Sequence, residues 1–156
     1  MIIFESIHII RFPDCDPFNH LNNARYLDYF HNAREDHLTT HYQFNVYEFA
    51  LKTGKSWVVS QNQIAYIKPA FLMEKVCIQT RNIAFGERDA LVEMLMWNES
   101  KTTLKSILWS TYVHIDLKTQ RSIPYDEYLI QLFSDKVYPL DKKIDFEKRV
   151  EQLKGH

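Results

Sequence analysis

Hydrophobic and polar residues follow patterns that predict a strand, a long helix, four further strands and terminal helices. Residues 2–12 are rich in Ile and Phe and predict a first strand, which Pro13 ends. Apolar residues then recur at spacings of three and four between residues 23 and 41, which predicts one amphipathic helix. Asn22 or Asn23 is the expected N-cap of this helix.

One face of the expected helix should pack against the rest of the fold, because its members lie three or four residues apart. This face carries Tyr26, Leu27, Phe30, Ala33, Arg34 and His37. Polar residues occupy most of the opposite face, which is therefore expected to face solvent.

The pattern then changes from a helical period to runs typical of strands. A short helix is expected at 45–52, ending at Gly54. Four strands are expected at 57–68, 75–85, 90–98 and 103–116. The connections at 86–89 and 99–102 are short and polar, as in hairpins, so we expect these four strands to form a meander. Two helices are expected at 124–134 and near 141–154, the last with Lys142, Lys143, Lys148 and Arg149 on a solvated face.

A helix and five antiparallel strands must bury each other's apolar faces. A long helix lying across a curled five-stranded sheet meets this need, so the predicted class is α+β, with helices added at the C-terminal end. Periodicity alone equally allows other α+β folds. The length of 156 residues suits one domain, and we predict that 1–156 form a single one.

Composition narrows the classes of function. The formal net charge of -1 does not indicate a broad face for polyphosphates, so no nucleic-acid partner is expected. The two cysteines, Cys15 and Cys77, are too few for a disulfide framework and are expected to be reduced thiols. The N-terminus lacks the pattern of a signal peptide, and no run approaches ~18 apolar residues. We therefore expect a cytoplasmic protein without a membrane segment.

Residues 11–35 carry the most specific motif of the chain. They read Arg-Phe-Pro-Asp-Cys-Asp-Pro-Phe-Asn-His-Leu-Asn-Asn-Ala-Arg-Tyr-Leu-Asp-Tyr-Phe-His-Asn-Ala-Arg-Glu. This segment resembles the opening of the 4-hydroxybenzoyl-CoA thioesterase-like hotdog family, with its D-x-D-x-x-G-H-x-N-N-A-x-Y-L pattern followed by an aromatic-rich helix. The likeness continues in residues 64–70, in Thr80 and in residues 115–124. The resemblance implies the hotdog arrangement of helix and sheet, and an acyl-CoA thioesterase.

Two positions depart from the family pattern. Asn19 stands where the family usually has Gly, and this position is expected to need a positive φ, which Asn tolerates better than most residues. Met73 and Glu74 stand where the family usually has Gly-Asp after the Pro-Ala turn. The second departure concerns the shape of a turn rather than the chemistry.

A thioester needs a nucleophile or base, and a group that stabilises the developing oxyanion. A carboxylate just before a helix N-terminus supplies both within one segment, because the first N–H groups of a helix are free. The resemblance assigns the catalytic carboxylate to Asp16 and the carbonyl-polarising backbone N–H to Asn23. Most loop aspartates only build an Asx turn, but the surrounding motif favours catalysis, with direct attack and general-base action both open.

Neighbouring residues have plainer explanations beside functional ones. Asp14 is expected to hold the loop as a hydrogen-bond acceptor. His20 is more often a scaffold than a catalyst in such a position, although it could orient water or substrate. Asn22 and Tyr26 are further candidates for contacts with substrate at the helix start.

More distant candidates for substrate binding come from the resemblance. In the family, the acyl pocket lies at a subunit interface and a strand of the second subunit often lines it, which implicates Ser60 and Asn62, although hairpin or edge pairing explains them equally well. Lys68, Arg81 and Arg88 are candidates for contacts with the CoA phosphates, although surface cations are more often merely solvated. The family forms dimers by joining sheets side by side, and dimers of dimers, so a homodimer or homotetramer is expected.

No metal or prosthetic group is expected, since CoA enters as part of the substrate. His37 and His41 lie four residues apart on a helix but have no third ligand in view, so packing and exposure explain them better. Cys15 stands between two aspartates, which should raise its pKa and make it a poor nucleophile.

Two other functions remain as alternatives. A hotdog hydratase would place Asp and His five residues apart, whereas Asp14 and Asp16 lie six and four residues before His20. A non-catalytic acyl-CoA or acyl-carrier binding protein would need no carboxylate at position 16. The preferred acyl chain, and the choice between CoA and acyl carrier protein, are left open by the sequence.

Overall fold

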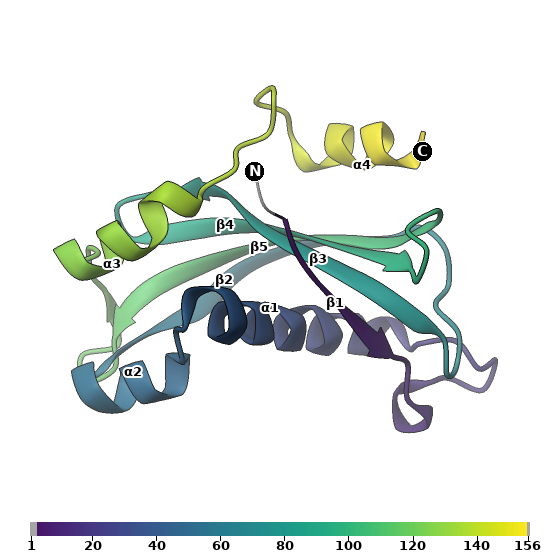
Figure 1. Cartoon of the computed structure of the whole chain (residues 1–156), viewed down its shortest axis with the longest axis horizontal. Coiled ribbons are helices and arrows are strands. Elements are labelled where there is room, and N and C mark those ends of the chain that lie inside the picture. The colour runs from purple at the N-terminus through teal and green to yellow at the C-terminus, as the bar shows by residue number, and fades with distance from the viewer. Residues whose placement is uncertain (1–2, 156) are drawn as a thin grey trace.

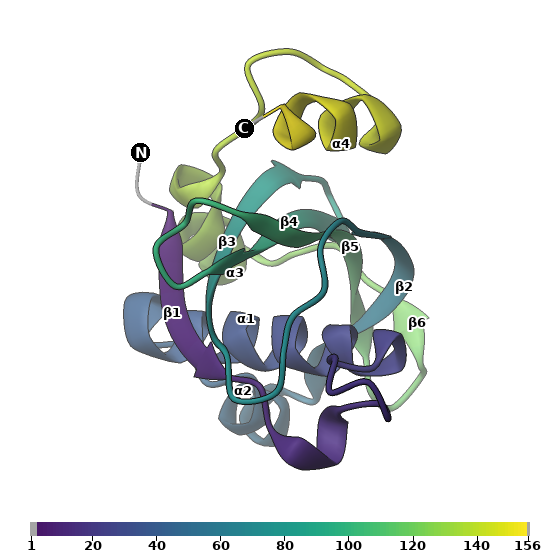
Figure 2. The same cartoon turned by 90° about the vertical axis from the view of Figure 1, so that its right-hand side faces the viewer.

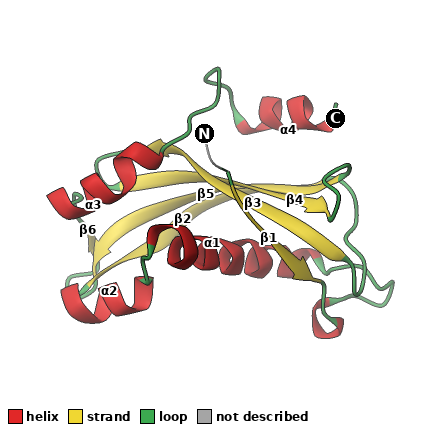
Figure 3. Ribbon diagram, in the orientation of Figure 1, coloured by secondary structure: helices red, strands yellow, loops and turns green. Residues whose placement is uncertain are grey.

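In the computed structural model of the chain, which describes residues 3–155, a curled antiparallel sheet wraps around one long helix (Figure 1 and Figure 2). The helices are α1 (Tyr26–Tyr42), α2 (Val46–Thr53), α3 (Glu127–Phe133) and α4 (Phe146–Lys154). The strands are β1 (Phe4–Ile9), β2 (Lys55–Tyr66), β3 (Lys75–Phe85), β4 (Asp89–Asn98), β5 (Leu104–Asp116) and the two-residue β6 (Arg121–Ser122). Figure 3 shows α1 on one face of the sheet and α4 on the other. The predicted helix on a curled sheet with C-terminal helices is thus confirmed; residue 2 of the first predicted strand lies outside the described residues.

The order of strands differs from a simple meander. Neighbouring strands follow the order β1-β3-β4-β5-β2, and β6 pairs with β5. Strands β3, β4 and β5 follow one another through the predicted hairpins, but β2 pairs with β5 and not with β3. The prediction of four meandering strands was therefore wrong for β2, because the chain crosses from one edge region of the sheet to the other between Tyr66 and Lys75.

Helix α1 begins with a short 3-10 turn over Asn23–Arg25. Asn22 is the N-cap, since its backbone is extended and its side-chain oxygen accepts a hydrogen bond from the Ala24 N–H at 3.0 Å. At the other end, Gln43 takes a left-handed conformation with φ 50, which terminates the helix. Of the two predicted caps, Asn22 is the one observed.

The concave face of the sheet packs on the predicted apolar face of α1. Tyr26, Phe30 and Ala33 are buried together with Val92 and Met94 of β4. Arg34 and His37 lie on the same helical face and are also buried, although both are polar. This face therefore combines an apolar core with a polar cluster toward the C-terminal half of α1.

The convex face is covered by α4. Phe146, Val150 and Leu153 of this helix pack with Ile107 and Trp109 of β5. Burial of these side chains holds α4 against the sheet, because a short amphipathic helix is stable only when its apolar face packs on a partner.

Arg149 anchors α4 by an ion pair and is a correction to the predicted solvated face. Its Nε lies 2.7 Å from Glu93 Oε2 and its Nη2 lies 2.8 Å from Glu93 Oε1. Glu93 is 1% exposed, and it also accepts from Trp109 Nε1 at 2.9 Å. The charge pattern of the helix did not reveal this pairing because the carboxylate partner is far away in sequence.

No helix among residues 3–155 is long and apolar enough to cross a membrane.

Candidate active site

The loop between β1 and α1 closes on itself and holds Asp16 in its centre. The Asn22 N–H donates to the Asp14 carbonyl at 2.9 Å, and Cys15 pairs with Leu21 as an isolated antiparallel bridge. The Asp16 N–H donates to the His20 carbonyl at 2.8 Å. These bonds bring the chain back to the helix start, so Asp16 and the first amides of the helix belong to one rigid unit.

The Asp16 carboxylate has both a structural and a free oxygen. Its Oδ1 accepts hydrogen bonds from the N–H groups of Phe18 at 2.9 Å and His20 at 3.0 Å. Among residues 3–155, no donor is recorded for Oδ2. The loop-building explanation of Asp16 is therefore correct for one oxygen, and the second oxygen has no protein donor within residues 3–155.

Two residues of this region adopt the left-handed backbone conformation expected of glycine. Asn19 has φ 62, as its place in the motif predicted. Met73, at the second departure from the family pattern, has φ 64. The turns therefore keep a glycine-like shape although neither residue is Gly.

The amide of Asn23 is the unused donor at the helix start. The Asn22 side chain caps Ala24, and the Arg25 N–H donates to the Asn22 carbonyl at 2.8 Å. No acceptor for the Asn23 N–H is recorded in the described part of the chain. A carbonyl oxygen placed here would meet a free donor at the positive end of a helix dipole.

The connection between β2 and β3 supports this loop from the side. The Leu21 N–H donates to the Ala70 carbonyl at 2.8 Å, and the Leu72 N–H donates to the Asn19 carbonyl at 2.8 Å. Tyr26 is 2% exposed, and its hydroxyl accepts from the Ala70 N–H at 3.2 Å. Two of the segments that carry the family resemblance thus hold each other in place.

Asp14 has the structural role expected of it, through a partner that the sequence did not indicate. Its Oδ2 accepts a hydrogen bond of 2.6 Å from the Tyr29 hydroxyl, and Tyr29 in turn accepts from the Arg11 N–H at 3.0 Å. Burial, with the Asp14 carboxylate adding to it, raises the pKa of Tyr29 to about 12. Asp14 is therefore engaged, in contrast to the free oxygen of Asp16.

His20 and Cys15 complete the loop. The His20 ring contacts Phe71 edge-on at 5.2 Å and lies 6.4 Å from the ring of the exposed Phe18. Loss of hydration raises the pKa of the Cys15 thiol, and the charges of Asp14 and Asp16 add to this. The predicted direction for Cys15 is correct, although desolvation is the larger cause.

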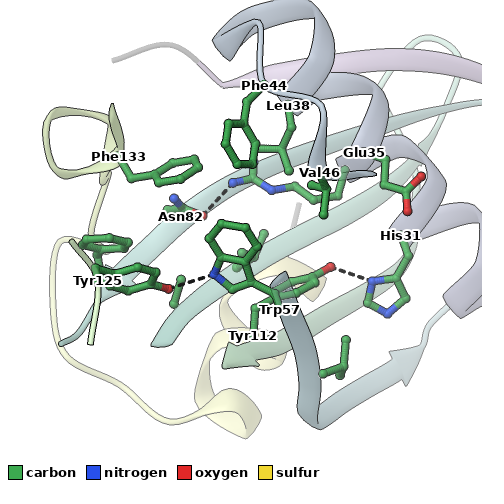
Figure 4. A pocket seen from close by; sticks show the side chains of 15 residues that line it. His31, Glu35, Leu38, Phe44, Val46, Trp57, Asn82, Tyr112, Tyr125 and Phe133 are labelled. Atoms are coloured by element: carbon green, nitrogen blue, oxygen red, sulfur yellow. Dashed lines mark hydrogen bonds between the residues drawn. The ribbon is translucent and has the colours of Figure 1, made fainter. Parts of the chain in front are cut away.

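A cavity of about 270 Å³ lies farther along α1, between this helix and the sheet. Figure 4 shows its aromatic wall, with Trp57, Tyr125 and Phe133, and its polar members His31, Asn82 and Tyr112. His31 Nδ1 and the Tyr112 hydroxyl are 2.6 Å apart, and burial lowers the pKa of His31. The cavity does not include Asp16 among its lining residues.

The floor of the cavity carries a buried cation. Arg34 lines the cavity and is 5% exposed, and its Nη2 donates to Asn82 Oδ1 at 2.7 Å. Its Nη1 donates to Thr80 Oγ1 at 3.3 Å, and the same oxygen lies 2.6 Å from His37 Nδ1. The sequence placed Arg34 on the packed face of the helix but gave no sign that it borders a cavity.

The predicted residues of β2 lie on an open edge. Residues 58–63 of β2 are exposed, and Ser60 falls at a β-bulge where the pairing register shifts. Asn62 Oδ1 accepts from Ser110 Oγ at 2.7 Å. In the single chain Ser60 and Asn62 therefore lie on an exposed edge strand, because β2 ends the sheet.

The three candidate cations lie in different places. Lys68 is exposed in the connection that packs beside the Asp16 loop. Arg81 lies 3.2 Å from Glu93 on the face that α4 covers. Arg88 donates to the Ser122 carbonyl at 2.8 Å, beyond the far end of β3, which is about 35 Å long at ~3.3 Å per residue.

Of the predicted residues, the structure thus brings together Asp16, His20, Asn22, Asn23 and Tyr26.

The two histidines of α1 each contact another side chain. His37 is hydrogen-bonded to Thr80, and the His41 ring stacks on Phe4 at 4.1 Å. Within residues 3–155, no group of three or more His, Cys, Asp or Glu side chains could hold a metal ion.

Comparison with known proteins identifies the family of the chain. A model described as the thioesterase-like superfamily matches residues 10–145. The long-chain acyl-CoA thioesterase FadM of Escherichia coli (strain K12) is 28% identical over 108 residues, which cover 69% of this chain and 80% of that protein.

Solved structures show the same fold. YbaW, a probable thioesterase from Escherichia coli, superposes with a TM-score of 0.73 at 24% identity, over 86% of this chain and 98% of that one. A DHNA-CoA thioesterase from Staphylococcus aureus superposes with a TM-score of 0.74 at 19% identity, over 99% of this chain and 93% of that one. The fold and the family predicted from the sequence are confirmed, and the chain belongs to the thioesterase-like superfamily of hotdog-fold thioester hydrolases.

Proposed function

We propose that the protein hydrolyses an acyl-CoA thioester to a free acid and CoA at the loop that carries Asp16. The observation that supports this most directly is the pairing of two unused groups on one rigid segment. Asp16 has one carboxylate oxygen without a donor, and Asn23 has a backbone N–H without an acceptor, in the part of the chain that the structure describes. The name of the FadM relative, a long-chain acyl-CoA thioesterase, agrees with this substrate class.

The two groups have complementary roles. The Asn23 N–H donates to the thioester oxygen and stabilises the negative charge that develops on it. As a general base, Asp16 takes a proton from water while the water oxygen adds to the carbonyl carbon. The tetrahedral intermediate then breaks its C–S bond, and the CoA thiolate leaves and takes up a proton.

Asp16 acting as a nucleophile gives the same products by another route. Its Oδ2 attacks the carbonyl carbon, CoA leaves as the thiolate, and a mixed anhydride forms on the enzyme. Water then cleaves the anhydride to the free acid and restores the carboxylate. One turnover in ¹⁸O-labelled water, followed by mass analysis of residues 11–25, tests this route, because attack by water at the carboxyl carbon of the Asp16 side chain leaves the label in the protein, whereas general-base action leaves it only in the acid product.

Other contacts of the substrate are proposed for residues near this loop and on the neighbouring subunit. His20, Asn22 and Tyr26 are proposed to contact the substrate near the thioester, and Lys68 is proposed to contact a CoA phosphate. Ser60 and Asn62 of a second subunit remain candidates for the acyl pocket, and Arg81 and Arg88 are weaker candidates because both are engaged within the chain. No cofactor is proposed beyond the CoA of the substrate, and the proposed location is the cytoplasm.

Asp16→Asn tests the carboxylate. The amide oxygen of Asn can accept the same bonds from Phe18 and His20, so the loop is expected to keep its shape while the charge is lost. We expect kcat for release of free thiol to fall by about 10³ or more, in keeping with the loss of a nucleophile or base. Asp28→Asn, which removes an exposed carboxylate from the first turn of α1, should leave kcat within twofold. A kcat of Asp16→Asn equal to that of the wild type would overturn the proposal. If the wild type binds acyl-CoA but does not hydrolyse it, the binding-protein alternative is favoured.

Asn23→Pro tests the amide. Proline removes this N–H at the first helical position, where helices tolerate it, and Asn22 before it is extended with ψ 133, as a residue before proline requires. We expect kcat to fall by about 10² to 10³, as for the loss of one oxyanion donor. Asn23→Ala keeps the N–H and should keep most of kcat, so equal losses in both variants would exclude the amide.

A further inference from the structure

The buried guanidinium of Arg34 is the feature of this molecule that the proposed hydrolysis does not use. Arg34 is 5% exposed, and its recorded partners among residues 3–155 are the neutral side chains of Asn82 and Thr80, with the Tyr42 ring 5.7 Å from its Cζ. No carboxylate of the described chain forms an ion pair with it. Burying a cation without an anion is unfavourable, and an unpaired buried charge that borders a cavity is a candidate site for a ligand that carries the opposite charge.

The other charged group at the cavity does not fill this role. Glu35 also lines the cavity, but it is an exposed residue, and its Oε1 accepts from the Tyr47 hydroxyl at 2.9 Å. His31 is the remaining titratable group of the α1 wall besides these two, and burial lowers its pKa, so it is neutral near pH 7. The buried end of the cavity is therefore positive, with an apolar and aromatic wall around it.

Asn82 provides a second donor at the same place. Its Oδ1 accepts from Arg34, which leaves its Nδ2 amide group, and no protein acceptor for this group is recorded among residues 3–155. Asn82 is 2% exposed and lines the cavity. A guanidinium and an amide donor side by side fit the two oxygens of a carboxylate.

The helix connects this site to the reacting end. Asn23 and Arg34 are eleven residues apart, which is about three helical turns, so both lie on the same side of α1. Leu27 and His31 lie between them at the same spacing of three to four residues. An acyl chain whose carbonyl oxygen meets the Asn23 N–H can therefore extend along this stripe toward Arg34.

The length of that chain follows from the helix rise. Eleven residues at 1.5 Å cover about 16 Å, and the Arg34 side chain leans back toward the helix start by several ångströms. An extended chain advances about 1.2 Å per bond, so an acyl group of roughly 8 to 13 carbons would reach from Asn23 to the guanidinium.

We propose that the cavity selects acyl groups that carry a carboxylate at the end remote from the thioester, with Arg34 and Asn82 as the binding residues for that carboxylate. This inference rests on the proposed function and narrows its substrate class to CoA monothioesters of dicarboxylic acids. A terminal hydroxyl would satisfy the donors but leave the buried charge unpaired, so the carboxylate is the better match.

The test compares acyl-CoAs of equal length that end in a methyl group or a carboxylate, from 6 to 16 carbons, by the rate of free thiol release. In the wild type, we expect kcat/KM for the carboxylate-ended substrate to exceed that of its methyl-ended counterpart by at least tenfold at one intermediate length. Asn82→Asp, which gives Arg34 an internal counter-ion of nearly the same shape, should abolish this preference and keep hydrolysis of methyl-ended substrates. Arg34→Met should do the same, since an apolar side chain is tolerated in place of a buried charge.

A control and a binding measurement separate the possible failures. Arg25→Met removes an exposed guanidinium from the start of the same helix and should leave the preference unchanged. Non-hydrolysable thioether analogues of both CoA series, measured by calorimetry, test the preference without turnover. The carboxylate site is overturned if the methyl-ended analogue binds more tightly than the carboxylate-ended one at every length. It is also overturned if Asn82→Asp and Arg34→Met lower kcat/KM equally for methyl-ended and carboxylate-ended substrates. Absence of hydrolysis with a retained carboxylate preference in binding overturns only the proposed reaction.

Discussion

At the scale of single residues, His37 links the buried polar cluster of α1 to the stability of the fold. It is 2% exposed, its Nδ1 lies 2.6 Å from Thr80 Oγ1, and its Nε2 lies 2.9 Å from Ser6 Oγ. Burial lowers its pKa to about 4 from the ordinary value of 6.5, and the charge of Arg34 adds to the shift. The unfolded chain therefore binds more protons than the folded one between these two values, so stability rises with pH across this window.

We expect the free energy of unfolding to fall as the pH is lowered from 6.5 to 4, with His37 contributing up to about 3 kcal/mol of the loss. His8, His31 and His114 also have lowered pKa values and add losses of the same sign. Urea denaturation at several pH values should show a shallower slope for His37→Gln than for the wild type. His41→Gln, which changes an exposed histidine of the same helix, is the control, and an unchanged slope in His37→Gln would contradict the assignment.

Residues of the candidate site differ in how far the sequence could predict them. Asp16, Asn22 and Asn19 are fixed by local geometry, since an Asx turn, an N-cap and a positive φ each depend on a few neighbouring residues. The partners of Asp14 and Arg34 were not predictable, because Tyr29 and Asn82 meet them only through tertiary packing. The free oxygen of Asp16 is likewise visible only after its partners are known.

At the scale of elements, α4 is held to the sheet by the largely buried ion pair between Arg149 and Glu93. Burial by itself raises the pKa of Glu93, but the bonds from Arg149 and Trp109 outweigh it, and the net pKa is lowered. Removing one partner of a buried charge is costly because the other charge stays desolvated. We expect Arg149→Met to lower the free energy of unfolding by about 3 kcal/mol, with Arg81 at 3.2 Å still compensating part of the Glu93 charge.

A double-mutant cycle measures this pairing. Glu93→Gln combined with Arg149→Met should cost at least about 1 kcal/mol less than the sum of the single changes, since the two side chains are in contact. Lys148→Met, at an exposed position of the same helix, should stay within about 0.5 kcal/mol of the wild type. Strict additivity in the cycle would show that α4 is held by its apolar contacts alone.

Element boundaries were close to the prediction where the period is strong. The strand expected at 75–85 is β3 without change, and the strand expected at 103–116 is β5 less one residue. The two-residue β6 was missed because so short a strand has no period of its own. The predicted C-terminal helices are shorter than expected, since Asp126 and Asp145 act as N-caps and set their starts.

At the scale of the whole molecule, the order of strands is the part of the fold that the sequence did not reveal. Hairpins fix the neighbours β3, β4 and β5 because short turns allow nothing else. The connection between Tyr66 and Lys75 is long enough to cross the sheet, so local pattern does not decide where β2 pairs. In the structure β2 takes the outer place beside β5, and Trp57 and Val59 of this strand line the cavity.

The open edge of β2 predicts association with a second copy of the chain. This strand has 12 residues, it ends the sheet, and Val58 and Val59 on it are 46% and 41% exposed. A long open edge offers unpaired backbone groups to another strand, whereas the opposite edge, β1, has only six residues. We therefore expect two chains to join at β2, and light scattering to give at least twice the 18.7 kDa of one chain.

Val58→Lys should raise the dissociation constant of this assembly by at least tenfold, because it places a charge on each copy at the joined edge. Leu117→Lys changes a residue that is 44% exposed but lies in the turn after β5, and it should leave the assembly intact. Because Val59 borders both the edge and the cavity, dilution to monomers is also expected to lower kcat/KM for long acyl chains. A wild-type monomer at micromolar concentration with full activity would contradict both expectations, and it would place the whole acyl site within one chain.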